Sequence, residues 1–191
     1  MPEIDLHSHS QYSDGSLTPA DLVALAARAG VKALALTDHD SVDGIAEARQ
    51  AAGAAGITLI AGVELSAVWG VHNIHVVGLQ VDTSNPVLKA GLERQAGARA
   101  ERGRQIGARL EALGMTGAYE GALALASSPD GLSRTHFSQW LYASKHVGTI
   151  QQAFDRYLGP RKPASVPMPW AELADTISWI HAAGGVAVLA H

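Results

Sequence analysis

Short apolar runs alternate with amphipathic stretches along the first 82 residues of the chain. Residues 4–8 alternate apolar and polar positions, a pattern typical of a half-buried strand. Mostly apolar runs at 31–36 and 57–61 predict two further strands. Between the strands, the segment 18–30 repeats apolar residues every three or four positions, and a second helix is predicted over 44–55. This order predicts a βαβαβ arrangement with a parallel sheet or barrel and right-handed crossovers.

The ends of these two helices carry residues that suit helix termini. Thr18 is predicted to cap the first helix, Pro19 suits its first position, and Asp21 interacts favourably with the positive end of the helix dipole. Gly30 and Gly56 are predicted to end the first and second helix. Because the next predicted strands begin directly after Gly30 and Gly56, short loops are expected in this part of the chain.

From residue 85 the pattern changes to helices alone. Apolar residues at a three-or-four spacing predict a long helix over 85–115. Shorter helices are predicted at 117–126, 133–144 and 150–158. No strand pattern occurs between 82 and 163. We therefore interpret residues 1–82 as the first half of the fold and residues 83–163 as a helical insertion into it.

Residues 164–191 return to the pattern of helix and strand. A helix is predicted over 170–183, followed by Gly184 and Gly185 and by a buried strand over 186–190. The chain then stops at His191, whereas termini normally lie on the surface and a complete (β/α) barrel usually needs about 250 residues. We expect this sequence to be the N-terminal part of a longer protein.

Composition narrows the classes of function. The 191 residues include no Cys, which excludes disulfides, thiolate metal sites and cysteine nucleophiles. The formal charge of −4 provides no basic field for duplex DNA. The sequence has no apolar run of signal-peptide or membrane-spanning length. We expect a cytoplasmic protein with no membrane partner, and the sequence leaves its oligomeric state open.

Histidine and carboxylate side chains recur at the ends of the predicted strands. His7 and His9 are two positions apart on a strand, so both project to the same side and can hold one metal ion. Asp14 follows in a Ser-Asp-Gly turn that can return it to the same place. The same residue types occur at or beside the other apolar runs, at Asp38, His39, Asp40, Glu64, His75 and His191. The alternative, a surface histidine pair with Asp14 as a turn residue, does not account for this recurrence, and we predict a metal site.

These motifs resemble those of the polymerase-and-histidinol-phosphatase (PHP) family of phosphoesterases. The resemblance covers the whole chain, and its motifs are at 5–10, 13–15, 37–40, 62–64 and 190–191. It implies a distorted (β/α)7 TIM-like barrel with a helical insertion, here incomplete at the C-terminus. The family pattern continues beyond His191 with an Asp ligand and a His ligand, which this sequence does not contain.

The resemblance also implies a cluster of two to three divalent metal ions. Manganese is the preferred ion, with zinc or iron as alternatives, because imidazole and carboxylate ligands suit these metals. Carried onto this sequence, the ligands are His7 and His9 for a first metal, Glu64 as a bridge, His75 and His191 for a second, and Asp14 and His39 for a third. Asp38 and Asp40 flank His39, and we assign them roles in proton transfer or in orienting the ligands, against the alternative of mere strand-end polarity.

The predicted insertion contains candidates for substrate binding. Arg134 and His136 lie near the start of a predicted helix, where anions bind favourably, and Lys162 lies in a proline-rich loop. The alternative is a surface arginine and a buried histidine. The insertion resembles that of nucleoside 3′,5′-bisphosphate phosphatases, whose relatives also trim RNA 5′ ends.

We therefore expect a metal-dependent phosphatase acting on a small phosphorylated nucleotide. The expected reaction removes the 3′-phosphate of nucleoside 3′,5′-bisphosphates, and short RNA is a further candidate substrate for 5′-to-3′ trimming. A histidinol-phosphate phosphatase is the alternative enzyme. An inactive PHP module or a truncated fragment is the alternative outside enzymes.

Overall fold

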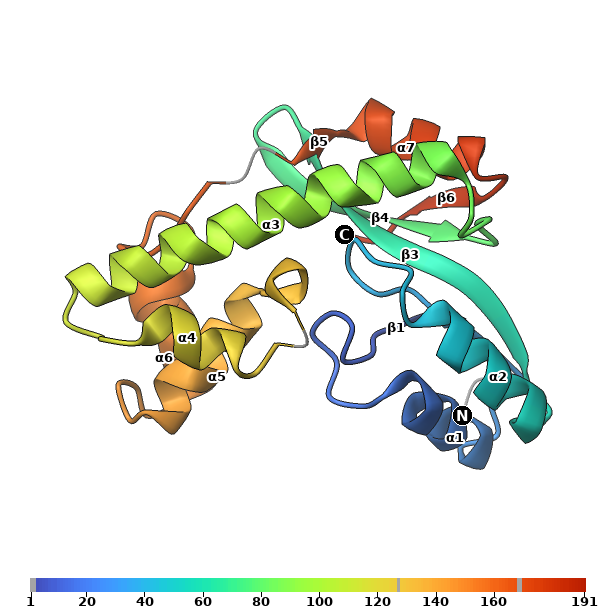
Figure 1. The fold of residues 1–191 in the computed structure, drawn as a ribbon, viewed down its shortest axis with the longest axis horizontal. Coiled ribbons are helices and arrows are strands. Elements are labelled where there is room, and N and C mark those ends of the chain that lie inside the picture. Colours follow the sequence, from blue (N-terminus) through green and yellow to red (C-terminus); the bar gives the residue numbers. More distant parts are fainter. Residues whose placement is uncertain (1–2, 127, 168–169) are drawn as a thin grey trace. The chain divides into compact units, whose positions relative to one another are not determined.

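The computed structural model describes residues 3–126, 128–167 and 170–191. The chain forms two compact units, one of Met1–Ala96 with Trp170–His191 and the other of Gly97–Pro169. The strands of the described chain belong to the first unit (Figure 1). The long helix α3 (Pro86–Ala112) begins in the first unit and continues into the second.

The first unit is built on a curved sheet whose strand order is β1-β2-β3-β4-β6, with β5 pairing beside β3. The strands are β1 (Ile4–Ser8), β2 (Ala33–Leu36), β3 (Thr58–Trp69), β4 (His72–Leu79), β5 (Ala171–Glu172) and β6 (Val186–Leu189). The first three strands pair in parallel, which confirms the predicted βαβαβ order. The protein therefore has an α/β fold.

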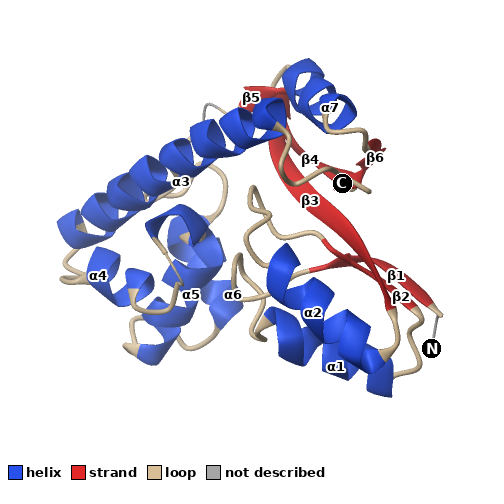
Figure 2. Ribbon diagram, turned by 45° about the vertical axis from the view of Figure 1, so that its right-hand side comes forward, coloured by secondary structure: helices blue, strands red, loops and turns tan. Residues whose placement is uncertain are grey.

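The long strand β3 changes its partner midway and joins the two parts of the sheet (Figure 2). Its first residues pair in parallel with β2, and from Gly62 onward it pairs with β4. A Cβ at Gly62 would lie 2.8 Å from a methyl group of Thr37 and 3.1 Å from the carbonyl oxygen of Gly78. Only glycine therefore lets the strands approach so closely at this crossing point.

The parallel pattern ends at β3. β4 pairs antiparallel with β3, and β6 pairs antiparallel with β4. Trp69 pairs with His72, so only Gly70 and Val71 connect the two strands. Gly70 has a φ of 59°, which suits a tight reversal of the chain. The chain turns back directly here, whereas a parallel neighbour would require a crossover connection.

Helices α1 (Pro19–Arg28) and α2 (Ile45–Ala55) lie side by side and pack with β2 in one apolar core. The cap at Thr18 is confirmed, because its side chain accepts a hydrogen bond from the N–H of Asp21 at 3.0 Å. Gly56 ends α2 in the left-handed conformation, as predicted. Leu34 and Leu36 are fully buried against these helices, and each contributes about 1.5–3 kcal/mol through burial.

Helix α7 (Leu173–Ala182) and the start of α3 form a second core with β3 and β4. The prediction of a helix starting at 170 was wrong, because Ala171–Glu172 pair in parallel with β3 as the short strand β5. The predicted long helix over 85–115 is confirmed as α3. Gly91 of α3 lies directly on the ring of Trp179, where a Cβ would clash with the indole.

The prediction that residues 186–190 form a buried strand was also wrong. Val186 and Leu189 of β6 are 56% and 67% exposed, because β6 pairs only with β4 among the described strands. β1 is the other edge of the sheet, and its Ile4 and Leu6 are also exposed. Both edges of the described sheet therefore present apolar side chains.

The second unit is helical throughout its described part. Its helices are α4 (Ala118–Leu123), η1 (Pro129–Gly131), α5 (Arg134–Ala143), α6 (Ile150–Ala153) and the π-helical turn η2 (Phe154–Leu158), together with the rest of α3. They surround a core of their own that includes Ile106, Leu110, Phe137, Leu141 and Leu158. The predicted short helices coincide with α4, α5 and α6 with η2.

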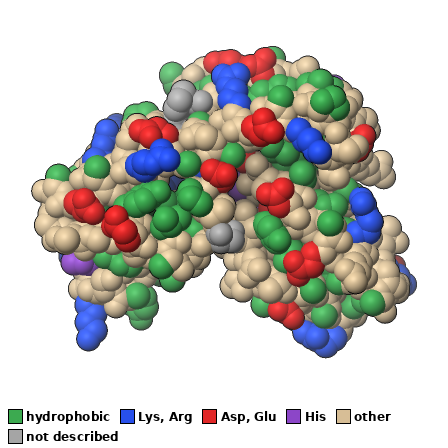
Figure 3. All heavy atoms as spheres, in the orientation of Figure 1, with side chains coloured by type: hydrophobic (Ala, Val, Ile, Leu, Met, Phe, Trp, Pro, Cys, Tyr) green, Lys and Arg blue, Asp and Glu red, His purple; other side chains and the backbone are tan. Residues whose placement is uncertain are grey.

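The described surface carries charges of both signs. On the face drawn in Figure 3, the described acidic and basic side chains are interspersed and form no extended basic field. None of the helices in the described ranges combines the length and apolar character that crossing a membrane requires.

We expect the exposed apolar edge of β6 to promote self-association of this 191-residue chain, because unpaired strand edges template pairing with another chain. Val188→Lys should shift the chain towards monomer in size-exclusion chromatography. Val71→Lys is the matched control, because Val71 is 92% exposed at the β3–β4 turn and lies outside β6. Equal effects of the two substitutions, or a chain that is monomeric to begin with, would contradict this expectation.

Candidate metal centre

The seven residues predicted as metal ligands line one cavity of about 330 Å³. They are His7, His9, Asp14, His39, Glu64, His75 and His191. Glu64 and His75 lie within β3 and β4, so the prediction that Glu64 follows the end of a strand was wrong, and the others lie at or after the ends of β1, β2 and β6. The structure therefore brings together side chains that are up to 184 residues apart in the sequence (191 − 7 = 184).

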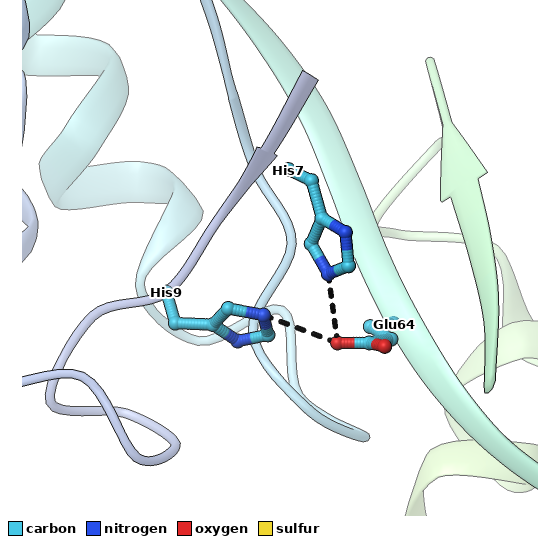
Figure 4. A group of neighbouring side chains, drawn as sticks. All are labelled: His7, His9 and Glu64. Carbon is cyan, nitrogen blue, oxygen red and sulfur yellow. Dashed lines mark hydrogen bonds and ion pairs between the residues drawn. The ribbon is translucent and has the colours of Figure 1, made fainter. Parts of the chain in front are cut away.

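Glu64 is the centre of this cluster and is only 1% exposed. One carboxylate oxygen, Oε2, lies 3.0 Å from Nε2 of His7 and 3.1 Å from Nε2 of His9, as Figure 4 shows. The same oxygen is 3.3 Å from Nδ1 of His39. The other oxygen, Oε1, lies 2.9 Å from Nδ1 of His75 and 3.6 Å from Nε2 of His191. Each oxygen of the buried carboxylate therefore faces its own group of imidazoles.

The five imidazole rings form a continuous row around the cavity. Consecutive ring centroids are 4.7–5.1 Å apart along the series His7, His9, His39, His75 and His191. Asp14 approaches this row, with Oδ1 at 3.9 Å from Nδ1 of His9 and 3.8 Å from Nε2 of His39.

The donor atoms are close enough together to bind metal ions. Three groups have ligand atoms that all lie within 4.8 Å of one another: His7 with His9 and Glu64, His9 with Asp14 and His39, and His39 with Glu64 and His75. Mixed nitrogen and oxygen donors of this kind suit manganese, zinc or iron. The residues present therefore fit a cluster of divalent metals.

The charges of the cluster shift the pKa values of its members. Burial alone would raise the pKa of Glu64, but hydrogen bonds from His75, His9 and His7, with the charge of His39, lower it far below its usual range. Burial lowers the pKa of His9, but its hydrogen bond to Glu64 and the charges of Glu64, Asp14 and Asp38 outweigh this effect and raise it above 6.5. The site therefore favours an ionised Glu64 and attracts positive charge.

The sequence matches the family described as PHP domain over residues 5–159. This chain belongs to the PHP family. The PHP chain is 47% identical to a 3′,5′-nucleoside bisphosphate phosphatase from Chromobacterium violaceum, over 100% of this chain and 67% of that protein. It is 46% identical to a 5′-3′ exoribonuclease from Haemophilus influenzae, over 98% of this chain and 68% of that protein.

One solved structure has the same fold as this chain. It is described as an amidohydrolase from Chromobacterium violaceum with bound sulfate and no metal, and it matches with a TM-score of 0.96 and 47% identity. The match covers 100% of this chain and 67% of that one. The PHP chain therefore spans about two thirds of the length of these relatives.

Asp38 and Asp40 lie beside the candidate metal centre but do not line its cavity. Both are buried acceptors: Asp38 accepts hydrogen bonds from Ser10 and Ser13, and Asp40 accepts them from the N–H and hydroxyl of Ser66 at 2.8 Å. Backbone hydrogen bonds also join their segment to β3, because Asp40 N–H donates to the Glu64 carbonyl and Glu64 N–H donates to the Asp38 carbonyl. Their predicted part in proton transfer stays a prediction.

Two of the three predicted substrate-binding residues lie together in the second unit. Arg134 and Lys162 line a cavity of about 660 Å³, in which Asp155 also lies. Burial lowers the pKa of Arg134, and its guanidinium lies 6.0 Å from the ring centroid of Phe154. His136 does not line this cavity.

His136 takes part in the N-terminal cap of α5. It is buried, and its Nδ1 accepts a hydrogen bond from the N–H of Ser133 at 3.1 Å. Sequence reasoning missed this capping box, because its usual signature has Glu or Gln at the position that His136 occupies. It also missed Ser10, Ser13 and Gln95, whose partners are 25 or more residues away in the sequence.

We expect His75→Gln to weaken the binding of Zn²⁺ or Mn²⁺ at least tenfold, because loss of a donor costs at least as much as loss of a residue supporting one. The ring of His75 contacts Glu64, so the substitution removes one donor from the centre of the cluster. Competition with a chelator of known affinity measures the change. His181→Gln is the control, because His181 lies on α7 outside this cavity and should leave the affinity unchanged.

The affinity for metal should also fall as the pH is lowered from about 8 to about 6, because protons compete for histidine nitrogens. The raised pKa of His9 places the start of this loss above the usual histidine range. Titration of Zn²⁺ affinity against pH measures it. An affinity that stays constant over this interval would show that the histidines do not hold the metal.

Proposed function

We propose that this PHP chain forms the metal-binding part of a phosphatase that removes the 3′-phosphate of nucleoside 3′,5′-bisphosphates. The observation that carries the proposal is the convergence of five imidazoles and Asp14 around the buried Glu64. The relative from Chromobacterium violaceum, named for this activity, supports the choice of substrate.

The geometry of Glu64 supports a bridging role between two metal ions. Its Oε2 faces His7 and His9, and its Oε1 faces His75 and His191. We assign the first pair to one metal and the second pair to another. Asp14 and His39 are the protein ligands for a third ion, with manganese preferred over zinc or iron.

Divalent metals, when bound, would supply charge neutralisation for the phosphoryl oxygens and a lowered pKa for water at the site. The protein residues hold and orient this centre. The imidazoles and Asp14 provide donors from separate elements of the fold, and the ionised Glu64 stabilises positive charge at the bottom of the cavity.

The cations of the second unit are assigned to an anionic group of the substrate. Arg134 and Lys162 line the same cavity, and an arginine can grip a phosphate through two parallel hydrogen bonds. His136 follows two residues after Arg134 and is buried. Through its hydrogen bond with Ser133 we assign it to holding the N-terminal end of α5, from which Arg134 would contact the substrate.

We further propose that the observed sheet belongs to a distorted (β/α)7 barrel with residues 83–163 as the insertion. The parallel β1, β2 and β3 with their intervening helices support this arrangement. The relatives extend over about one and a half times the length of this chain, which leaves room for further strands in proteins of this family.

Trimming of short RNA from its 5′ end is the second candidate function. The relative from Haemophilus influenzae, a 5′-3′ exoribonuclease, supports it.

Histidinol phosphate is the rival small substrate. Against the non-catalytic alternative, every expected ligand up to His191 is present and lies at the cavity.

The substrate prediction is tested on the protein extended to the length of its relatives and loaded with Mn²⁺. We expect nucleoside 3′,5′-bisphosphates to lose their 3′-phosphate faster than histidinol phosphate loses its own, as measured by phosphate release. Arg134→Ala should raise KM about tenfold with little change in kcat, because it removes a charge-assisted hydrogen bond made equally in the ground and transition states.

Arg104→Ala is the matched control for this substitution. Arg104 is an exposed arginine of the same unit that pairs with Glu101 and lies outside the Arg134 cavity. It should leave KM unchanged. Faster hydrolysis of histidinol phosphate would refute the substrate assignment and leave the metal centre standing.

A further inference from the structure

Asp38 is a buried carboxylate with three hydrogen-bond donors directed at it. Its Oδ1 accepts from the backbone N–H of Ser10 and from the hydroxyl of Ser13, each at 2.7 Å. Its Oδ2 accepts from the hydroxyl of Ser10 at 2.7 Å. All three residues are buried, so these bonds form away from bulk water.

The hydroxyl of Ser13 also contacts a ligand of the candidate metal centre. Ser13 Oγ lies 3.2 Å from Nδ1 of His9. A carboxylate has no proton to donate, so Ser13 gives its only hydroxyl proton to Asp38 and offers His9 a lone pair. Nδ1 of His9 must therefore carry the N–H. Nε2 faces the carboxylate of Glu64 at 3.1 Å and donates to it when His9 is protonated on both nitrogens. In a neutral His9 with its proton on Nδ1, Nε2 instead carries the lone pair, which a metal ion would accept.

We propose that Asp38, acting through Ser13, is a positioning residue that holds His9 as the Nδ1–H tautomer and directs its Nε2 lone pair at the metal. This role deepens the proposed function and rests on one part of it, namely that Nε2 of His9 binds a metal ion. Hydrogen bonds from the second nitrogen of a histidine ligand select its tautomer and orientation in metal sites generally.

The same carboxylate holds the loop that carries Asp14. Ser10, held by two hydrogen bonds to Asp38, accepts hydrogen bonds from the N–H groups of Ser13 and Gly15 through its carbonyl. A side chain at Gly15 would clash with the backbone of His9, so glycine allows the loop to fold back this far. Asp14 is thereby returned to within 4 Å of both His9 and His39. One buried carboxylate thus orients one ligand and places another.

Two serine variants separate this role from general stabilisation. Ser10 and Ser13 are both buried, and each hydroxyl lies 2.7 Å from Asp38. Each hydroxyl has one further contact, which is the N–H of Tyr12 for Ser10 and the imidazole of His9 for Ser13. Ser13→Ala and Ser10→Ala should therefore lower the melting temperature by similar amounts. Only Ser13→Ala should release the tautomer of His9.

The tautomer is read from the ¹⁵N shifts of the imidazole nitrogens in metal-free protein at alkaline pH, where the rings are neutral. His9→Gln identifies the His9 signals by their loss. Without metal, Glu64 favours a proton on Nε2 and Ser13 favours one on Nδ1, so wild type and Ser10→Ala should show a larger share of the Nδ1–H form than Ser13→Ala. In competition with a chelator, Ser13→Ala should weaken Zn²⁺ binding about tenfold, in the range typical for residues that support a metal ligand. Ser10→Ala should weaken it clearly less.

Substitutions of Asp38 complete the test. Asp38→Asn keeps an oxygen that can accept from Ser10 N–H and Ser13, so it should keep the Nδ1–H form, whereas Asp38→Ala should lose it. Equal tautomer populations and equal Zn²⁺ affinities in the two serine variants would overturn the proposal.

The outcomes also separate this inference from the proposed function. A protein that shows the expected differences but releases no phosphate from bisphosphates would refute the function and leave the positioning role intact. Wild-type protein that binds no Zn²⁺ would overturn the metal part of the inference, and the shifts of metal-free His9 would still decide the tautomer.

Discussion

The first unit of this protein must stabilise one buried charge, the carboxylate of Glu64. Removing an ionised carboxylate from water costs several kcal/mol unless partners offset it. Here the partners are imidazoles from β1, from the loop after β2, from β4 and from the chain following β6. The charge is stable only while those separate elements are in place, so the site and the fold of this unit depend on each other.

The sheet supplies the geometry that this carboxylate needs. β3 pairs with β2 up to Ala61 and with β4 from Gly62 onward, and Glu64 lies two residues beyond that exchange. Beyond the end of β2 the two segments stay paired, through an isolated parallel bridge between His39 and Glu64 and through hydrogen bonds from Ser66 to Asp40. The backbone hydrogen bonds that join Asp38 and Asp40 to Glu64 therefore hold the segment of His39 beside the strand that carries Glu64.

The two units contain cavities with different side chains. The first contains the dense cluster of donors in which a carboxylate is kept ionised, a setting suited to metal ions and to the phosphoryl group. The second contains a larger cavity lined by Arg134 and Lys162, whose positive charges suit an anion.

Residue patterns predicted the parallel strands and the caps at Thr18 and Gly56, and the resemblance to PHP motifs supplied the seven side chains that line the cavity. Periodicity, capping and motif spacing are local properties that survive in a linear sequence. The antiparallel pairing of β4, the exposure of β6, and the link from Asp38 through Ser13 to His9 became visible in the folded chain. These features arise from which segments meet in space, and a serine at position 13 acquires its role only because folding brings it to a carboxylate 25 residues away.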